Sequence, residues 1–192
     1  MEIKNDLHKY IVVFDNILHE STLRNFTKWV RTLKFEKAKV IGDKEEVVEE
    51  KIRKTLSITM ASLNEPSMTK VHWTNYLMFH FNNYVKGYDK LFKFNEDYKV
   101  NDIQLLKYVK GGHYLFHVDD CATTNRRLSC IYFVNDEYEG GDLHFKYPNS
   151  EDVTKIEKKK NRLVVWPSNF LYPHSVKEVT KGERYSVVAW AQ

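Results

Sequence analysis

A histidine and an aspartate two residues apart, His117 and Asp119, are the side chains of this sequence best spaced to do chemistry. In an extended segment, residues two apart lie on the same face, so the imidazole and the carboxylate would lie side by side. Together they supply two thirds of the 2-His-1-carboxylate set that holds non-haem Fe(II). His174 is the natural third ligand, and His144 is its competitor. Two histidines and an aspartate could also hold the zinc ion of a hydrolase.

Arg184, which follows His174 by ten residues, favours iron over zinc. A three-ligand iron site leaves open positions, which a 2-keto acid could chelate while dioxygen takes another. The far carboxylate of such a diacid needs a buried cation, and arginine suits this because it binds carboxylates bidentately and stays charged. Ser186 would face the same way and could add a hydroxyl. A zinc hydrolase offers no role for Arg184.

Three motifs around these residues resemble those of the iron(II)- and 2-oxoglutarate-dependent oxygenases, and within them the prolyl 4-hydroxylase superfamily. Residues 108–119 meet the pattern Tyr-x-x-Gly-x-x-Tyr-x-x-His-x-Asp. Residues 126–141 hold a basic residue, a strand and a Gly-Gly pair, and residues 173–184 run from Pro-His to a basic residue. The ending 184–190 looks like the oxygen-sensing prolyl hydroxylase branch. The resemblance covers about residues 101–192.

This resemblance implies a double-stranded β-helix, or jelly roll, in which His117, Asp119 and His174 hold Fe(II). Arg184 would bind the distal carboxylate of 2-oxoglutarate, and Tyr108 would donate a hydrogen bond. O2 is the implied co-reactant and ascorbate an implied reductant. The implied reaction is oxidative: 2-oxoglutarate is decarboxylated and an unactivated C–H bond is hydroxylated, here a prolyl residue in a peptide or protein.

The strand at 128–134 departs from the family pattern at one position. Phe133 stands where the oxygen-sensing branch has a tyrosine that helps to bind the carboxylate. Strand phase places Ser129 and Ile131 on the same face, toward the cosubstrate. Because Ser129 stands where the collagen-type branch has a threonine, we expect it to be the carboxylate partner beside Arg184. Two further matches lie near the expected substrate mouth: Arg126 and Trp190.

The second half of the chain has the sequence pattern of short strands. β-Branched and aromatic runs alternate there with turn residues, which is typical of an antiparallel sandwich or jelly roll. We therefore predict an α+β, mainly β fold: one domain over residues 1–192, with helical support in 1–100 and a catalytic core in about 101–192. The predicted strands are 103–109, 128–134, 143–145, 163–166 and 184–190.

The first half predicts helices more than strands. Apolar residues recur at helical spacing over 20–35, with Ser21 as the expected N-cap, and again over 67–86. Residues 11–14 predict a strand, and the charge-dense stretch 43–54 is compatible with a helix or a mobile loop. A mobile loop over the mouth is usual in the family, and residues 41–63 are our candidate for it.

Composition excludes several classes of protein. The 192 residues carry a net charge of +4, too small to indicate nucleic-acid binding, and no apolar run is long enough to span a membrane. The charged N-terminus does not look like a signal peptide, and Cys121 and Cys130 make no disulfide framework, so we expect a cytoplasmic protein; a single disulfide stays open. Lys-, Asn-, Tyr- and Phe-rich usage hints at an AT-rich microbial or viral genome.

Two alternatives to a prolyl hydroxylase stay open. The same chemistry could act on a free amino acid, a small metabolite or a nucleobase, although no basic residue follows Arg184 to favour the last. A jelly-roll binding module without turnover is the other, and the intact ligand set argues against it. His113 and Asp120 are expected to be loop residues, and residues 158–160 a solvated turn. The sequence leaves the substrate, the regiochemistry and the oligomeric state undetermined.

Overall fold

The computed structural model describes residues 6–41, 46–61, 65–120, 125–148 and 151–192. Its helices are the 3₁₀ helix η1 (Leu7–Tyr10), α1 (Glu20–Val30) and α2 (Met68–Phe92). Its strands are β1 (Val12–Asp15), β2 (Glu36–Lys37), β3 (Val40–Ile41), β4 (Glu46–Val47), β5 (Arg53–Lys54), β6 (Leu56–Thr59), β7 (Val100–Tyr108), β8 (His113–His117), β9 (Leu128–Phe133), β10 (Glu139–Gly140), β11 (Leu143–Lys146), β12 (Val153–Ile156), β13 (Arg162–Pro167), β14 (His174–Val176), β15 (Val179–Lys181) and β16 (Arg184–Ala191).

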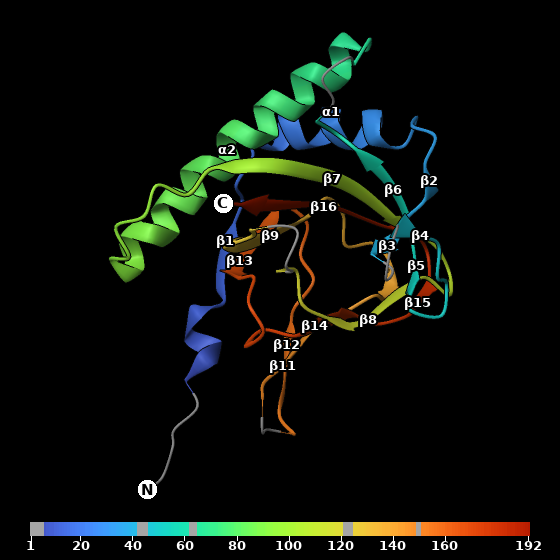
Figure 1. Ribbon diagram of the computed structural model, residues 1–192. Helices are drawn as coiled ribbons and strands as arrows, with labels where there is room; N and C mark the ends of the chain where they lie inside the picture. The colour runs from blue at the N-terminus through green and yellow to red at the C-terminus, as the bar shows by residue number, and fades with distance from the viewer. Residues whose placement is uncertain (1–5, 42–45, 62–64, 121–124, 149–150) are drawn as a thin grey trace, which may run out of the picture.

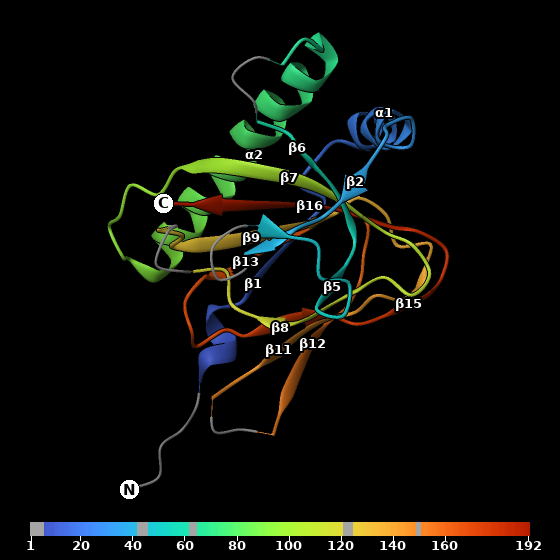
Figure 2. The same ribbon diagram turned by 45° about the vertical axis from the view of Figure 1, so that its right-hand side comes forward.

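Two antiparallel sheets face each other and form the core of the fold. The larger sheet has seven strands in the order β1-β13-β9-β16-β7-β6-β2, and the smaller has five in the order β12-β11-β14-β8-β5. Helices α1 and α2 cover the outer face of the larger sheet, while the smaller sheet lies on its other side (Figures 1 and 2). The predicted mainly β jelly roll with supporting helices is confirmed.

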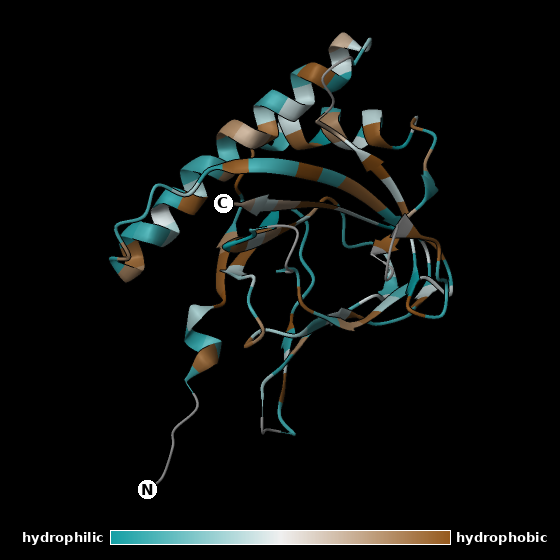
Figure 3. Ribbon diagram, in the orientation of Figure 1, coloured by the Kyte–Doolittle hydropathy of each residue, from teal (hydrophilic) through white to brown (hydrophobic). Residues whose placement is uncertain are grey.

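Helix α2 is the principal support of the larger sheet. Its side chains Leu77, Phe81 and Val85, spaced four residues apart, are fully buried in the same core cluster as Ile103 and Tyr132 of the sheet. Burial of each such side chain stabilises the fold by about 1.5–3 kcal/mol. Apolar and polar segments alternate along α2 and β7 (Figure 3), as expected of elements with one buried face. The helix continues six residues beyond the predicted end at residue 86, to Phe92.

Helix α1 is shorter than predicted and begins differently. It ends at Val30, and its N-cap is His19, whose Nδ1 accepts a hydrogen bond from the Ser21 backbone N–H at 3.3 Å. The prediction of Ser21 as the N-cap is therefore wrong. Ser21 lies within the first turn, where its hydroxyl contacts the same ring nitrogen at 2.8 Å.

The first hundred residues contribute strands to both sheets, and not helical support alone. β1, β2 and β6 belong to the larger sheet, and β5 belongs to the smaller one. Residues 46–47 and 53–54 are strands, so 43–54 forms neither the helix nor the loop that we considered; residues 42–45 lie outside the described part.

The expected mobile loop over residues 41–63 is wrong for its second part. β5 pairs with β8, β6 pairs with β7, and Met60 is buried, so residues 53–60 are anchored in the core. Residues 62 and 63 lie outside the described part. No helix of the described residues has both the length and the apolar character needed to cross a membrane.

Candidate functional site

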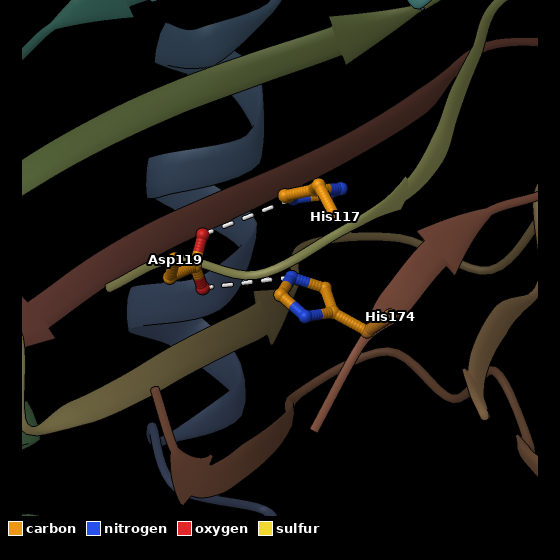
Figure 4. Close-up of side chains that lie close together, drawn as sticks. All are labelled: His117, Asp119 and His174. Carbon is orange, nitrogen blue, oxygen red and sulfur yellow. Dashed lines mark ion pairs between the residues drawn. The ribbon is translucent and has the colours of Figure 1, made fainter. Parts of the chain in front are cut away.

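Three side chains that could hold a metal converge between the two sheets: His117, Asp119 and His174. Their ligand atoms all lie within 4.8 Å of one another. The Nε2 of His117 is 3.8 Å from Oδ1 of Asp119, and the Nε2 of His174 is 3.5 Å from Oδ2 (Figure 4). The antiparallel pairing of β14 with β8 sets His174 directly opposite His117. Strand register therefore brings together residues that are far apart in the sequence.

The hydrogen bonds of both histidines assign their protonation. The Nδ1 of His117 lies 2.8 Å from the Leu115 carbonyl, and the Nδ1 of His174 lies 3.2 Å from the Tyr172 carbonyl. Because a carbonyl only accepts, each Nδ1 must carry a proton, which leaves Nε2 as the ring nitrogen that offers a lone pair to a metal. Both lone pairs face the Asp119 carboxylate. Three electron-pair donors directed at one another form a site for a cation.

Electrostatics keep these groups in their metal-binding forms. Burial and the neighbouring His174 lower the pKa of His117 to about 3, so its ring is neutral at physiological pH. Burial acts to raise the pKa of Asp119, but Coulomb attraction to the protonated forms of His174 and His117, together with the hydrogen bond from Ser129, holds this pKa below its ordinary value. Ser129 Oγ donates to Asp119 Oδ2 at 2.6 Å.

Aromatic rings hold the two imidazoles in place. Tyr114 stacks on His117, with ring centroids 3.5 Å apart and planes at 16°. Trp166 meets His174 edge-on at 4.9 Å and 70°. Neither ring was predicted to contact a ligand residue, although Tyr114 belongs to the motif at 108–119 and could have been found from it.

Arg184 is fully buried and lacks a counter-ion. Its Nη1 donates to Ser186 Oγ at 2.7 Å, while its Nε and Nη2 have no hydrogen-bond partner among the described residues. Its guanidinium carbon lies 5.0 Å from the centre of the Tyr108 ring and 5.2 Å from that of Phe133. No described carboxylate forms an ion pair with it. A buried charge without a partner costs several kcal/mol, so this is the environment in which a ligand carboxylate would be stabilised.

A cavity of about 900 Å³ opens onto the three candidate metal ligands. Arg184 does not line the cavity itself; Tyr108, which does, packs against the guanidinium. Arg126 and Trp190 also line it, and the Arg126 guanidinium carbon stacks 3.7 Å from the centre of the Trp190 ring. Of the side chains expected at the site, the cavity wall contains Tyr108, His117, Asp119, Arg126, Ile131, His174 and Trp190.

The expectation for Ser129 is corrected. Its hydroxyl is bonded to Asp119 and to Ser168 Oγ at 2.8 Å, and it does not lie beside Arg184. Phe133, four residues further along β9, occupies that place, and four residues of strand span about 13 Å. The alternation of side chains along a strand correctly placed Ser129 and Phe133 on one face. It could not show which of them lies beside Asp119 and which lies beside Arg184. Ser129 is a positioning residue for Asp119.

Other candidates fall outside the site. His144 lies on β11 opposite Ser175 and is not part of the ligand group. His113 is the first residue of β8 and not the loop residue that we expected, and its Nδ1 lies 3.1 Å from the Gly111 carbonyl oxygen. Residues 158–160 end in a turn, and Lys159, for example, pairs with Asp15 at 3.0 Å. Cys130 is a free, buried thiol; the disulfide left open is not described, because Cys121 lies outside the described residues.

Comparison with known proteins agrees with this geometry. The model of the 2OG-Fe(II) oxygenase superfamily matches residues 103–192. A PKHD-type hydroxylase of Prochlorococcus marinus is 36% identical over 98 residues, covering 49% of this chain and 42% of that protein. Human prolyl 3-hydroxylase 3 is 39% identical over 70 residues, covering 36% of this chain and 10% of that protein. The chain thus spans less than half the length of these curated relatives.

Solved structures extend the likeness to nearly the whole chain. A prolyl hydroxylase from Trichoplax adhaerens, solved with a peptide fragment of the hypoxia inducible factor oxygen degradation domain, superimposes with a TM-score of 0.71. The identity is 20%, and the match covers 95% of this chain and 83% of that one, so it establishes the fold. The match to the 2OG-Fe(II) oxygenase superfamily lies in residues 103–192, the part of the chain that holds all three candidate metal ligands and the buried arginine.

Proposed function

We propose that this protein is an Fe(II)- and 2-oxoglutarate-dependent dioxygenase that hydroxylates a prolyl residue of a peptide or protein. The observation that supports this most directly is the pairing of two complementary sites in one fold. The ligand atoms of two histidines and a carboxylate converge within 4.8 Å of one another, and a buried guanidinium has no carboxylate partner among the described residues. A ferrous ion and a dicarboxylic keto acid together would complete both.

The residues divide the work of such a reaction between them. His117, Asp119 and His174 would hold Fe(II), and Arg184, whose Nη1 is held by Ser186, would bind the distal carboxylate of 2-oxoglutarate. The chemistry that this metal and cosubstrate supply when bound is oxidative decarboxylation by O2, coupled to hydroxylation of a C–H bond. Ser129 holds Asp119 in place, and Tyr114 and Trp166 fix the two imidazole planes. Tyr108 and Ile131 line the cavity and would limit access of water to the cosubstrate.

Peptidyl proline is proposed from the relatives and from the size of the cavity. The relatives include a prolyl 3-hydroxylase, and the Trichoplax prolyl hydroxylase was solved with a peptide. A cavity of about 900 Å³ is near the upper end of the usual range for ligand pockets, so a five-carbon diacid would leave room for part of a second molecule. Arg126 and Trp190 lie on its wall and are proposed to contact the peptide.

Two measurements test the proposal in sequence. Purified protein with Fe(II), ascorbate and O2 should convert 2-oxoglutarate to succinate, and Asp119→Ala should lose this conversion. Proline-containing peptides incubated with the active protein should gain the mass of one oxygen atom, and amino-acid analysis then separates 3- from 4-hydroxyproline. No succinate from the wild-type protein under any substrate would contradict the enzyme assignment.

The alternatives give different outcomes in the same assays. A free amino acid, small metabolite or nucleobase as substrate predicts peptide-independent turnover that increases when cell-extract metabolites are added. A binding module without turnover predicts that 2-oxoglutarate binds but is not consumed.

A further inference from the structure

Beside Arg184 lies a second buried polar side chain that the proposed function does not use, Tyr138. It precedes β10, is 5% exposed, and its hydroxyl has no hydrogen-bond partner among the described residues. A buried hydroxyl without a partner loses about 1–3 kcal/mol of hydration without compensation. Such a group in a native fold indicates a ligand or an ordered water.

The backbone around Gly141 shows how closely Tyr138 and Arg184 approach. Gly141 has φ +63°, and a Cβ built on it would lie 3.0 Å from Tyr138 Cε2 and 3.1 Å from Arg184 Cδ. The side chains of Tyr138 and Arg184 therefore both pack against the backbone at Gly141. Burial raises the pKa of Tyr138, and the guanidinium of Arg184 is the strongest influence in the opposite direction, as expected of near neighbours.

The position of Tyr138 is fixed from several sides. The Nζ of Lys158 lies 4.7 Å from the centre of the Tyr138 ring and donates to the Tyr138 carbonyl oxygen. Gly182, at φ +79°, packs against the Tyr138 backbone, where a Cβ would come within 3.2 Å of its Cα. An aromatic ring held in this way presents its hydroxyl without a further loss of side-chain entropy.

We propose that the Tyr138 hydroxyl is a second donor to the distal carboxylate of 2-oxoglutarate, alongside Arg184. This inference rests on the proposed function and deepens it. Position 133, where the oxygen-sensing branch has a tyrosine, is here Phe133, whose ring lies 5.2 Å from the guanidinium carbon and offers no hydroxyl. Tyr138 supplies the missing hydroxyl from the following loop, and Ser186 remains committed to Arg184 Nη1.

The test is the affinity for 2-oxoglutarate, measured by calorimetry on protein loaded with Mn²⁺ so that binding is observed without turnover. Tyr138→Phe removes only the hydroxyl and should raise the Kd for 2-oxoglutarate about ten- to hundredfold, the range for one hydrogen bond to a charged group. Binding of 2-oxobutanoate, which has the keto-acid end but no distal carboxylate, should not change, and neither should Mn²⁺ affinity.

Tyr147→Phe is the matched control. It makes the same chemical change at a buried tyrosine whose hydroxyl donates to Thr154 Oγ1 at 2.9 Å, and the Kd for 2-oxoglutarate should stay at the wild-type value. An unchanged Kd in Tyr138→Phe, or equal losses for both keto acids, would overturn the role of Tyr138 and leave the proposed function intact. Failure of the wild-type protein to bind 2-oxoglutarate would overturn both.

Discussion

Replacing Arg184 by methionine is expected to make the ligand-free protein more stable while removing its response to 2-oxoglutarate. The guanidinium is fully buried, with one hydrogen bond, two ring contacts and no carboxylate partner among the described residues. Methionine has a similar length and no charge, and it adapts to irregular space. The two expected effects have opposite signs, which separates a ligand-binding arginine from a structural one.

The magnitude follows from these contacts. Arg184→Met loses the bond to Ser186, about 1.5–3 kcal/mol because the donor is charged, and two cation–π contacts of about 0.5–1 kcal/mol each. It also removes the penalty of several kcal/mol for an unpaired buried cation, which is the larger effect. The expected net change is a gain of about 1–2 kcal/mol in the free energy of unfolding. For a chain of this size that raises the Tm by about 2–8 °C.

Thermal unfolding in the presence of Mn²⁺, with and without 2-oxoglutarate, measures both effects. At a ligand concentration of about 100 times the wild-type Kd, the wild-type protein should gain about 2.7 kcal/mol, and Arg184→Met, which keeps only the keto-acid contacts, should gain less than about 1.4 kcal/mol. Arg24→Met is the control, because Arg24 is exposed on α1, and its effect should stay within about 0.5 kcal/mol. A lower Tm for Arg184→Met without ligand, or a Tm that rises with 2-oxoglutarate as much as that of the wild-type protein, would refute the reasoning.

Three further substitutions test the site and the fold. Ser129→Ala removes the 2.6 Å bond to Asp119 and should weaken metal binding about 10- to 100-fold by calorimetry, whereas Ser175→Ala, at a buried hydroxyl without a partner, should not. Gly141 has φ +63°, and a methyl group on it would lie 2.9 Å from the side chain of Val179. Gly141→Ala should therefore lower the free energy of unfolding, measured in urea, by about 1–3 kcal/mol. An unchanged urea midpoint would count against this expectation. A hydrogen-bonded guanidinium lowers the pKa of Asp15 from 3.8 to about 2, so the carboxylate stabilises the fold above about pH 4 and this contribution is lost as the pH falls toward 2. Asp15→Asn should therefore cost about 1 kcal/mol at pH 7 and almost nothing at pH 2, and equal stability of the two proteins at pH 7 would contradict this.

Strands with their own apolar signal could be predicted from the sequence, and strands without it could not. β9, β13 and β16 lie within a residue or two of the runs at 128–134, 163–166 and 184–190, because continuous apolar and β-branched residues are typical of strands buried on both faces. β5 and β6 were missed. They are short and mostly half-exposed, and it is pairing with β8 and β7, more than 45 residues away, that makes them strands.

The sequence by itself indicated the residues of this candidate site: the pair His117 and Asp119 on one face, a third histidine at position 174 or 144, and an arginine suited to a diacid. Spacing is local, and a strand's period of two assigns each side chain to a face without reference to the rest of the chain. Which residues meet across the cavity was decided only by the tertiary structure. Packing of the larger sheet against the smaller one placed Ser129 on Asp119, and the loop before β10 brought Tyr138 to Arg184. These contacts join segments that are far apart in the sequence. Local sequence does not predict them, because strand pairing and packing, and not local preference, bring the segments together.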